Sequence, residues 1–369
     1  QGEAGLAAVQ EAAGYYRALA QANPDAHLPD LAGTLNNLAI HLRVAGQDEA
    51  ALTTTEQAVD IHRALAQANP QRYLPDLANS LNNLAIQLGV AGQDEAALTA
   101  VHEAVDTRRA LAQANPQRYL PDLAGSLNNL AIHLGEADQG EAGLAAVQEA
   151  AGYYRALAQA NPDTHLPDLA SSLNNLAIHL SVAGQDEAGL AAVQEATGYY
   201  RALAQTNPQR YLPDLASSLN NLAIHLSVAG QDEAGLAAVQ EAAGYYRALA
   251  QTNPQRYLPD LANSLNNLAI HLSVAGQNKA GLAAVQEAAG YYRALAQANP
   301  DTHLPNLATT LNHLAIHLRV AGQDQAALTT TEQAVDIHRA LAQANPAAFE
   351  GALQQSMTLR AQLGSHFLP

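Results

Sequence analysis

Apolar residues recur at the spacing of an α-helix through the first complete unit of the chain. In the first half of that unit they stand at Leu28, Leu31, Ala32, Leu35, Leu38, Ala39 and Leu42. Steps of three and four residues put these side chains on one helical face. The pattern predicts a helix, here called helix A, with Pro29 in its first turn, Asp30 at its positive end and a stop at Ala45-Gly46.

The second half of the unit repeats the spacing and predicts helix B. Its apolar face is formed by Ala51, Leu52, Thr55, Ala58, Val59, His62 and Leu65. Helix B begins at Asp48-Glu49 and ends at Asn69-Pro70, because the residue before a proline is pushed out of the α region. Arg63 falls near the predicted C-terminal end, where a cation meets the helix dipole favourably.

The dipeptide Asn-Pro shows that this unit is repeated. It recurs every 46 residues, at Asn23, Asn69, Asn115, Asn161, Asn207, Asn253, Asn299 and Asn345. Residues 185–230 and 231–276 differ at two positions only, Thr197 against Ala243 and Ser217 against Asn263. Copies this similar must fold alike, so one unit describes them all.

A single helix pair cannot cover its own apolar faces, so neighbouring pairs must stack. The predicted fold is all-α: a helical-repeat solenoid of antiparallel helix pairs with a 46-residue period, forming a single domain over residues 1–369. An orphan helix B (1–23) precedes the repeats and a C-terminal capping helix (346–369) follows them. The predicted repeats are 24–69, 70–115, 116–161, 162–207, 208–253, 254–299 and 300–345. Tyrosine and histidine rings near the helix ends are expected to pack between repeats.

The two ends carry different patterns. Gln1-Gly2-Glu3-Ala4 matches Gln139-Gly140-Glu141-Ala142 inside a unit, so the first element is a helix B without its helix A. We therefore expect the chain to be a fragment of a protein that is longer on the N-terminal side. Beyond Pro346 the unit's leucines are replaced by Glu350, Arg360 and Gly364. The added polar face is what a terminal cap requires, and predicts a natural C-terminal boundary.

Composition excludes several classes of function. There is no cysteine, so no disulfide, thiolate metal site or thiol nucleophile can form. The formal net charge is -17, from 34 acidic and 17 basic residues, with Lys279 the one lysine. Such a chain is a poor partner for nucleic acid. No apolar run approaches the roughly 18 residues that a membrane span needs, and there is no signal-like segment, so a cytoplasmic location is expected.

The unit resembles the tetratricopeptide repeat (TPR), a helix-turn-helix motif with a characteristic order of leucine, alanine and glycine. The matching residues are Leu35, Leu38, Ala39, Leu42, Gly46, Ala51 and Ala58. The Leu-Asn-Asn-Leu-Ala segment is similar to the longer repeats of kinesin light chains and of bacterial arrays attached to signalling NTPases. The acidic net charge predicts a neutral or basic partner. The resemblance implies a right-handed superhelix in a bacterial protein, whose helix A surface binds a protein or an extended peptide. It also implies that the extra length lies in helix B.

In the resembling family the helix A wall is the binding surface, which makes an asparagine ladder the candidate site here. An amide both donates and accepts hydrogen bonds, so it can hold the main chain of a bound peptide. The candidate partner-binding residues are Asn37, Asn83, Asn129, Asn175, Asn221, Asn267 and His313, with Ile40, Arg43 and Arg319. Bridging between neighbouring helices is the alternative role for these amides. For the preceding asparagines, such as Asn36, we expect the structural role.

Histidines recur along helix A, but a metal site is not expected. Equivalent side chains in stacked repeats lie about 8–10 Å apart, whereas zinc needs nitrogens about 2 Å from a shared ion. One pair, His313 and His317, shares a helical face four residues apart, and no third ligand accompanies it. We therefore expect no metal and no cofactor.

Catalytic motifs are absent from the sequence, and its acids repeat unit after unit. We predict a non-enzymatic scaffold or sensor module that binds a protein partner. The alternative is a structural array that self-associates head to tail through its cut N-terminal repeat.

Overall fold

The structure, a computed structural model, describes residues 2–364. Within this range the chain forms sixteen α-helices and no strand, which confirms the predicted all-α repeat fold. The chain divides into two compact units, Gln1–Gln185 and Asp186–Pro369. Each unit is described by itself, and the predicted single domain stays a prediction.

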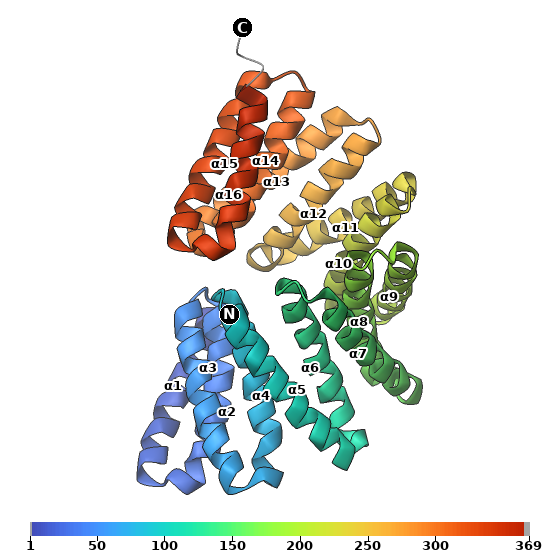
Figure 1. The fold of residues 1–369 in the computed structure, drawn as a ribbon. Coiled ribbons are helices and arrows are strands. Elements are labelled where there is room, and N and C mark those ends of the chain that lie inside the picture. The colour runs from blue at the N-terminus through green and yellow to red at the C-terminus, as the bar shows by residue number, and fades with distance from the viewer. Residues whose placement is uncertain (1, 365–369) are drawn as a thin grey trace. The chain divides into compact units, whose positions relative to one another are not determined.

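In each unit, successive helices pack side by side and run in opposite directions (Figure 1). The first unit contains α1 (Gly2–Ala22), α2 (Pro24–Val44), α3 (Asp48–Ala68), α4 (Pro70–Val90), α5 (Asp94–Ala114), α6 (Pro116–Glu136), α7 (Gly140–Ala160) and α8 (Pro162–Val182). The second contains α9 (Asp186–Thr206), α10 (Pro208–Val228), α11 (Asp232–Thr252), α12 (Pro254–Val274), α13 (Asn278–Ala298), α14 (Pro300–Val320), α15 (Asp324–Ala344) and α16 (Pro346–Gly364). Even-numbered helices up to α14 are the predicted A helices, and odd-numbered ones are the B helices. The last five residues of the predicted capping segment lie outside the described range.

Helix A starts earlier than its sequence predicts. In the first repeat α2 begins at Pro24, so Pro29 lies inside the helix and Asp30 is its seventh residue. Helices A and B are both 21 residues long, so the extra length of the unit is not confined to helix B. Residues that precede the predicted start of helix A, such as Tyr73, therefore belong to its first turn. There the guanidinium of Arg72 lies 5.0 Å from the Tyr73 ring centroid.

A single asparagine separates helix B from the next helix A. Asn69 ends α3 and also caps α4, because its Oδ1 accepts the backbone N–H of Arg72 at 3.3 Å. Pro70 at the first helical position lacks only an N–H that would have had no helical partner. The Asn-Pro dipeptide therefore produces a sharp reversal without leaving helix ends unsatisfied.

The core of each unit is a row of leucines and alanines between neighbouring helices. In α2 the leucines Leu31, Leu35 and Leu42 are buried, and so are the alanines Ala32 and Ala39. Alanine at these positions allows close approach of the packed helices. Every A helix repeats the pattern, so each helix pair depends on its neighbours for burial.

Candidate functional site

One face of the A helices carries the candidate site, and we call it the A face. It is defined by the residues equivalent to Asp30, Gly33, Asn37, Ile40 and Val44, where equivalent positions differ by multiples of 46. These positions lie three or four residues apart and therefore share one helical face. Ile40 and Val44 are 43% and 75% exposed, which is unusual for large apolar side chains in a packed repeat.

The Asn37 series, Asn37 and its equivalents, lies on this face with its amides at least partly exposed. Its members are Asn37, Asn83, Asn129, Asn175, Asn221 and Asn267, followed by His313. No side-chain hydrogen bond joins any of the six amides to another described residue. Arg43 and Arg319 are exposed near the ends of α2 and α14.

The preceding asparagines behave differently, and their expected structural role is confirmed. Asn36 donates through Nδ2 to Oγ of Ser80 at 2.7 Å, which ties α2 to α4. Across the next interface Asn82 Oδ1 accepts from Ser126 at 3.2 Å. Further bridges join Ser172 to Asn128 (2.9 Å), Ser264 to Asn220 (3.0 Å), Asn266 to Thr310 (2.8 Å) and Asn312 to Ser356 (2.7 Å).

The Asp30 series was missed in the sequence as part of the site. Its carboxylates were assigned to helix starts, but Asp30 lies in the second turn of α2 and lines a cleft with Asn37. The series comprises Asp30, Asp76, Asp122, Asp168, Asp214 and Asp260, with Asn306 in the last repeat. Its spacing of seven residues from the Asn37 series was a visible signal that the two share a face. The Asp30 series therefore adds carboxylates to the A face.

Burial disfavours the charged form of two acids in the second unit. It raises the pKa of Asp214 and of Asp260, while Arg256 acts in the opposite direction on both and Arg210 on Asp214. Desolvation disfavours the charged carboxylate, which the nearby guanidinium groups only partly offset. These carboxylates are thus incompletely compensated in the folded chain.

At one repeated position of the B helices, a ring side chain contacts the neighbouring A helix. Tyr154 donates its hydroxyl to the carbonyl oxygen of Pro121 at 3.2 Å, and burial raises its pKa. Tyr292 makes the equivalent bond to Pro259, and burial raises its pKa to about 12. His62 takes this position in the first complete repeat and lies 2.7 Å from Ser80 Oγ through Nδ1. Burial lowers the pKa of His62, although the Asp76 carboxylate acts in the opposite direction.

Arg108 is the exception at this position. Its guanidinium is 6% exposed and donates to the backbone oxygen of Asp122 at 2.9 Å, to Ser126 Oγ and to Asn79 Oδ1 at 2.5 Å. These acceptors are all neutral, and burial lowers the pKa of Arg108 while the Asp122 carboxylate raises it. A charged group thus lies in a wall otherwise formed by uncharged rings.

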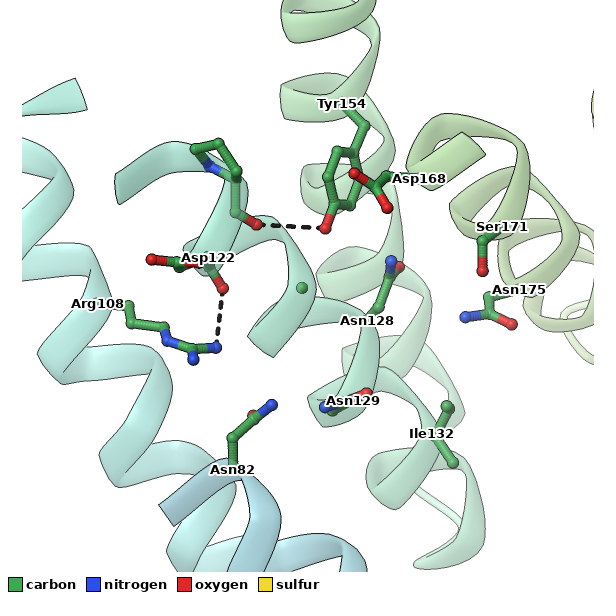
Figure 2. Close-up of a pocket in the computed structure, with 12 residues that line it drawn as sticks. Asn82, Arg108, Asp122, Asn128, Asn129, Ile132, Tyr154, Asp168, Ser171 and Asn175 are labelled. Carbon is green, nitrogen blue, oxygen red and sulfur yellow. Dashed lines mark hydrogen bonds between the residues drawn. The ribbon is translucent and has the colours of Figure 1, made fainter. Parts of the chain in front are cut away.

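Arg108 lines a cleft of about 620 Å³ over α4, α6 and α8 (Figure 2). The amides of Asn82, Asn128 and Asn129 surround the same space, and the Tyr154 hydroxyl lies at its far side. The cleft is predominantly polar. It can therefore offer hydrogen bonds to a ligand main chain.

A second cleft of about 520 Å³ adjoins the first and is mainly apolar. Ile132, Ile178 and Val182 form its walls, and Ile132 and Asn175 line both clefts. The unusual turn after α6 contributes Asp138, whose φ is 56° where the equivalent residues are glycines. A polar and an apolar cleft thus lie side by side within the first unit.

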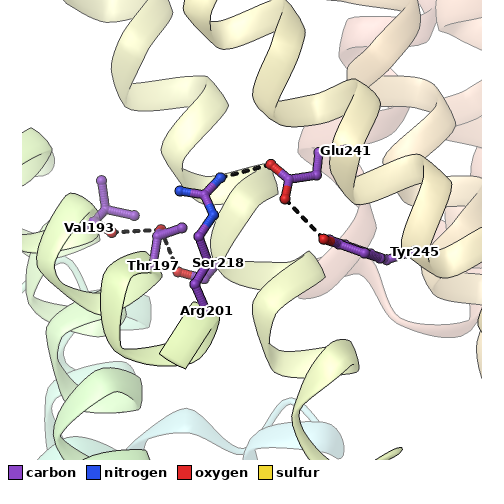
Figure 3. Close-up of polar contacts among 6 residues, drawn as sticks. All are labelled: Val193, Thr197, Arg201, Ser218, Glu241 and Tyr245. Carbon is purple, nitrogen blue, oxygen red and sulfur yellow. Dashed lines mark hydrogen bonds and ion pairs between the residues drawn. The ribbon is translucent and has the colours of Figure 1, made fainter. Parts of the chain in front are cut away.

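Ion pairs join successive B helices. Arg63 pairs with Glu103 of the next B helix at 2.8 Å, so it does not act at the end of its own helix as predicted. In the second unit Arg201 pairs with Glu241 at 2.7 Å, and Glu241 also accepts from the Tyr245 hydroxyl (Figure 3). These contacts connect repeats and leave the A face uninvolved.

Burial disfavours the charged form of both members of the histidine pair. His313 and His317 both have a pKa lowered by burial, and His313 lowers that of His317 further. The described part of the chain contains no group of three or more potential ligands from His, Cys, Asp or Glu. Among the helices described, none is both long and apolar enough to cross a membrane.

Similar folds occur among solved structures. BtubC (BKLC) from P. vanneervenii matches with a TM-score of 0.53 and 19% identity, over 67% of this chain and 92% of that one. The apo form of RapI matches with a TM-score of 0.58 and 9% identity, over 85% and 99%. Aspartyl phosphate phosphatase F from Bacillus subtilis matches with a TM-score of 0.53 and 12% identity, over 82% and 71%. No protein-family model and no curated protein sequence matches the chain.

These similarities concern the fold. The chain is a TPR-like solenoid of repeating helices, as its sequence predicts.

Proposed function

We propose that the A face binds an extended segment of a partner protein, so that the chain acts as an interaction scaffold. The observation that carries this proposal is the contrast between two adjacent asparagine series. Asn36 and its equivalents bond to the next repeat, whereas Asn37 and its equivalents have no intramolecular partner. Main-chain groups of an extended segment can satisfy such amides whatever its side chains are.

Exposed apolar residues support the same surface. Ile40 and Val44 belong to strips that continue along the A face, and the apolar cleft at Ile132, Ile178 and Val182 gives a side chain a place to be buried. Binding surfaces commonly combine an apolar anchor site with a few polar groups that set orientation. The fold shared with other TPR-like proteins supports an interaction role by analogy.

A random peptide library displayed against the immobilised full chain tests the proposal. We expect enriched segments to lose at least tenfold in affinity when Asn83, Asn129 and Asn175 are all changed to alanine. The matched control changes Thr53, Thr99 and Gln148, three exposed polar residues of B helices in the same unit, to alanine. Equal binding by both triple variants would contradict a role for the A face.

Self-association stays the competing prediction. Light scattering over a hundredfold range of protein concentration measures the mass directly. A mass that rises with concentration supports head-to-tail stacking, and a constant monomer mass removes it.

A further inference from the structure

A cleft of about 460 Å³ lies at the start of the A face in the first unit. Asp30 and Asp76 contribute carboxylates from α2 and α4, and Tyr16 and His62 contribute rings from α1 and α3. No ion pair joins either carboxylate to another described side chain. The cleft therefore holds two negative charges with no direct counter-ion.

The remaining polar groups do not supply the missing positive charge. Burial lowers the pKa of His62, which favours the neutral form of its ring. Asn36 also lines the cleft, is 9% exposed, and has no hydrogen-bond donor to its Oδ1. A covered acceptor without a donor is uncommon, since buried polar atoms are nearly always hydrogen-bonded. A cation with several N–H donors would complement the two carboxylates and the unpaired oxygen of Asn36.

An equivalent cleft two repeat lengths further along already contains such a group. There Asp122 and Asp168 replace Asp30 and Asp76, and Arg108 replaces Tyr16. The guanidinium of Arg108 donates to the backbone oxygen of Asp122 (Figure 2). It also donates to the side-chain oxygens of Ser126 and Asn79. This equivalent cleft thus has an arginine where the first has Tyr16. No arginine lines the first cleft, although Asn79 in its wall accepts a hydrogen bond from Arg108.

We propose that the first cleft binds the guanidinium of an arginine side chain carried by the partner segment. This inference rests on the proposed function of the A face. A guanidinium is planar, carries five N–H donors and can stack on an aromatic ring, so Tyr16 and the two carboxylates complement it better than they complement the point charge of a lysine. Asp30 and Asp76 supply the charge, and the Asn37 series holds the adjoining main chain.

A small probe tests the cleft without any partner. N-acetyl-arginine methylamide is titrated into the full chain, and the ring signals of His62 and Tyr16 are followed by NMR. We expect saturable shifts of both rings, and at least tenfold weaker effects from the citrulline analogue, which has the same shape without the charge. Absence of shifts with the arginine probe would overturn the proposal.

Variants without the two carboxylates test whether the arginine probe binds at the first cleft. Asp30→Asn with Asp76→Asn should weaken the arginine probe at least tenfold, and asparagine is tolerated here because Asn306 occupies the equivalent position in α14. The matched control, Asp94→Asn with Glu95→Gln, makes the same charge change at the exposed start of α5 and should leave binding unchanged. If both variants bind the arginine probe equally weakly, overall charge explains the binding and the proposed site is wrong.

The peptide library separates this inference from the proposed function. Segments enriched on the unmodified chain should contain arginine, and on the Asp30→Asn, Asp76→Asn chain they should still bind but lose that preference. Segments that bind without any arginine preference overturn the inference and leave the function intact. If the library yields no enriched segment, the proposed function is contradicted. The probe titration still shows whether the first cleft binds a guanidinium.

Discussion

Arg108 donates from Nη2 to the side-chain oxygen of Asn79 at 2.5 Å, across the interface between α5 and α4. Its equivalents are mostly tyrosines that bond a backbone oxygen of their own repeat, as Tyr154 does with Pro121. The guanidinium is buried without an ion-pair partner among the described residues. Burying an uncompensated charge costs stability, and an uncharged side chain that fits the same space is often an improvement.

Arg108→Tyr is therefore expected to stabilise the chain. Asn79 is exposed and can return to water, and Ser126 keeps its bond to Asn82, so no buried polar group is left without a partner. The free energy of unfolding should rise by about 1 kcal/mol, measured by urea unfolding. The reverse change, Tyr154→Arg, should lower it, and a loss of stability in Arg108→Tyr would contradict this explanation.

Substitutions at the adjacent residues Asn128 and Asn129 should have different effects on stability and on binding. Asn128 accepts from the buried Ser172 at 2.9 Å, so Asn128→Ala should lower the free energy of unfolding by about 1–2 kcal/mol. Asn129 has no such bond, and Asn129→Ala should change stability by less than about 0.5 kcal/mol while weakening segment binding. Urea unfolding and library-derived peptides measure the two effects. Similar stability losses in both variants would show that Asn129 also has a structural role.

Much of the fold could be predicted because its determinants are local. The leucine spacing and the Asn-Pro dipeptide are short-range signals, and they specify where helices lie and where helix B ends. Pro24 and Pro29 are equally compatible with the first turn of a helix, so the sequence does not show which of them begins α2. Only the longer helix seen in the structure distinguishes them. A helix that starts at Pro29 has Asp30 at its end, whereas in the structure Asp30 lies in the second turn of α2, on the A face.

Contacts between repeats were harder to predict. Arg63 was assigned to its own helix dipole, but its partner Glu103 is 40 residues away, where only the packing of successive B helices brings it close. Arg108 illustrates the same limit, since its neighbours come from α4 and α6. The Asn36 series bonds to the next A helix and the Asn37 series does not, because only the first faces that helix. The sequence pattern alone only partly indicates which of two adjacent amides faces a neighbouring helix.

The turn after α6 offers a second stability test. Six equivalent turns have glycine with φ between 69° and 72°, but Asp138 has φ 56°. A side chain in the left-handed region costs about 1 kcal/mol, so Asp138→Gly should raise the free energy of unfolding by up to that amount. Gly184→Asp, at a regular turn of the same unit, should lower it by a similar amount. Thermal or urea unfolding measures both, and an unchanged Gly184→Asp variant would count against strain as the cause.

Buried histidines should make the second unit sensitive to mild acid. Burial lowers the pKa of His225, His271 and His317 below the usual 6.5, although an aspartate opposes the shift at the first two. Their contribution to stability is complete above the unfolded pKa and is lost as the pH falls from about 6.5 towards the folded pKa, because the unfolded chain takes up protons first. Each such histidine costs up to about 1.4 kcal/mol per pH unit in that window.

Replacing these three histidines by glutamine should flatten the pH dependence. Gln87 occupies the equivalent buried position in α4, so the side chain fits the site. Urea unfolding at pH 7.5 and pH 5.5 should show a smaller difference for the triple variant than for the unmodified chain. Asp214 and Asp260 cannot explain an acid loss, since their raised pKa favours the folded state as the pH falls. An equal loss in both chains would therefore assign the sensitivity to groups other than these histidines.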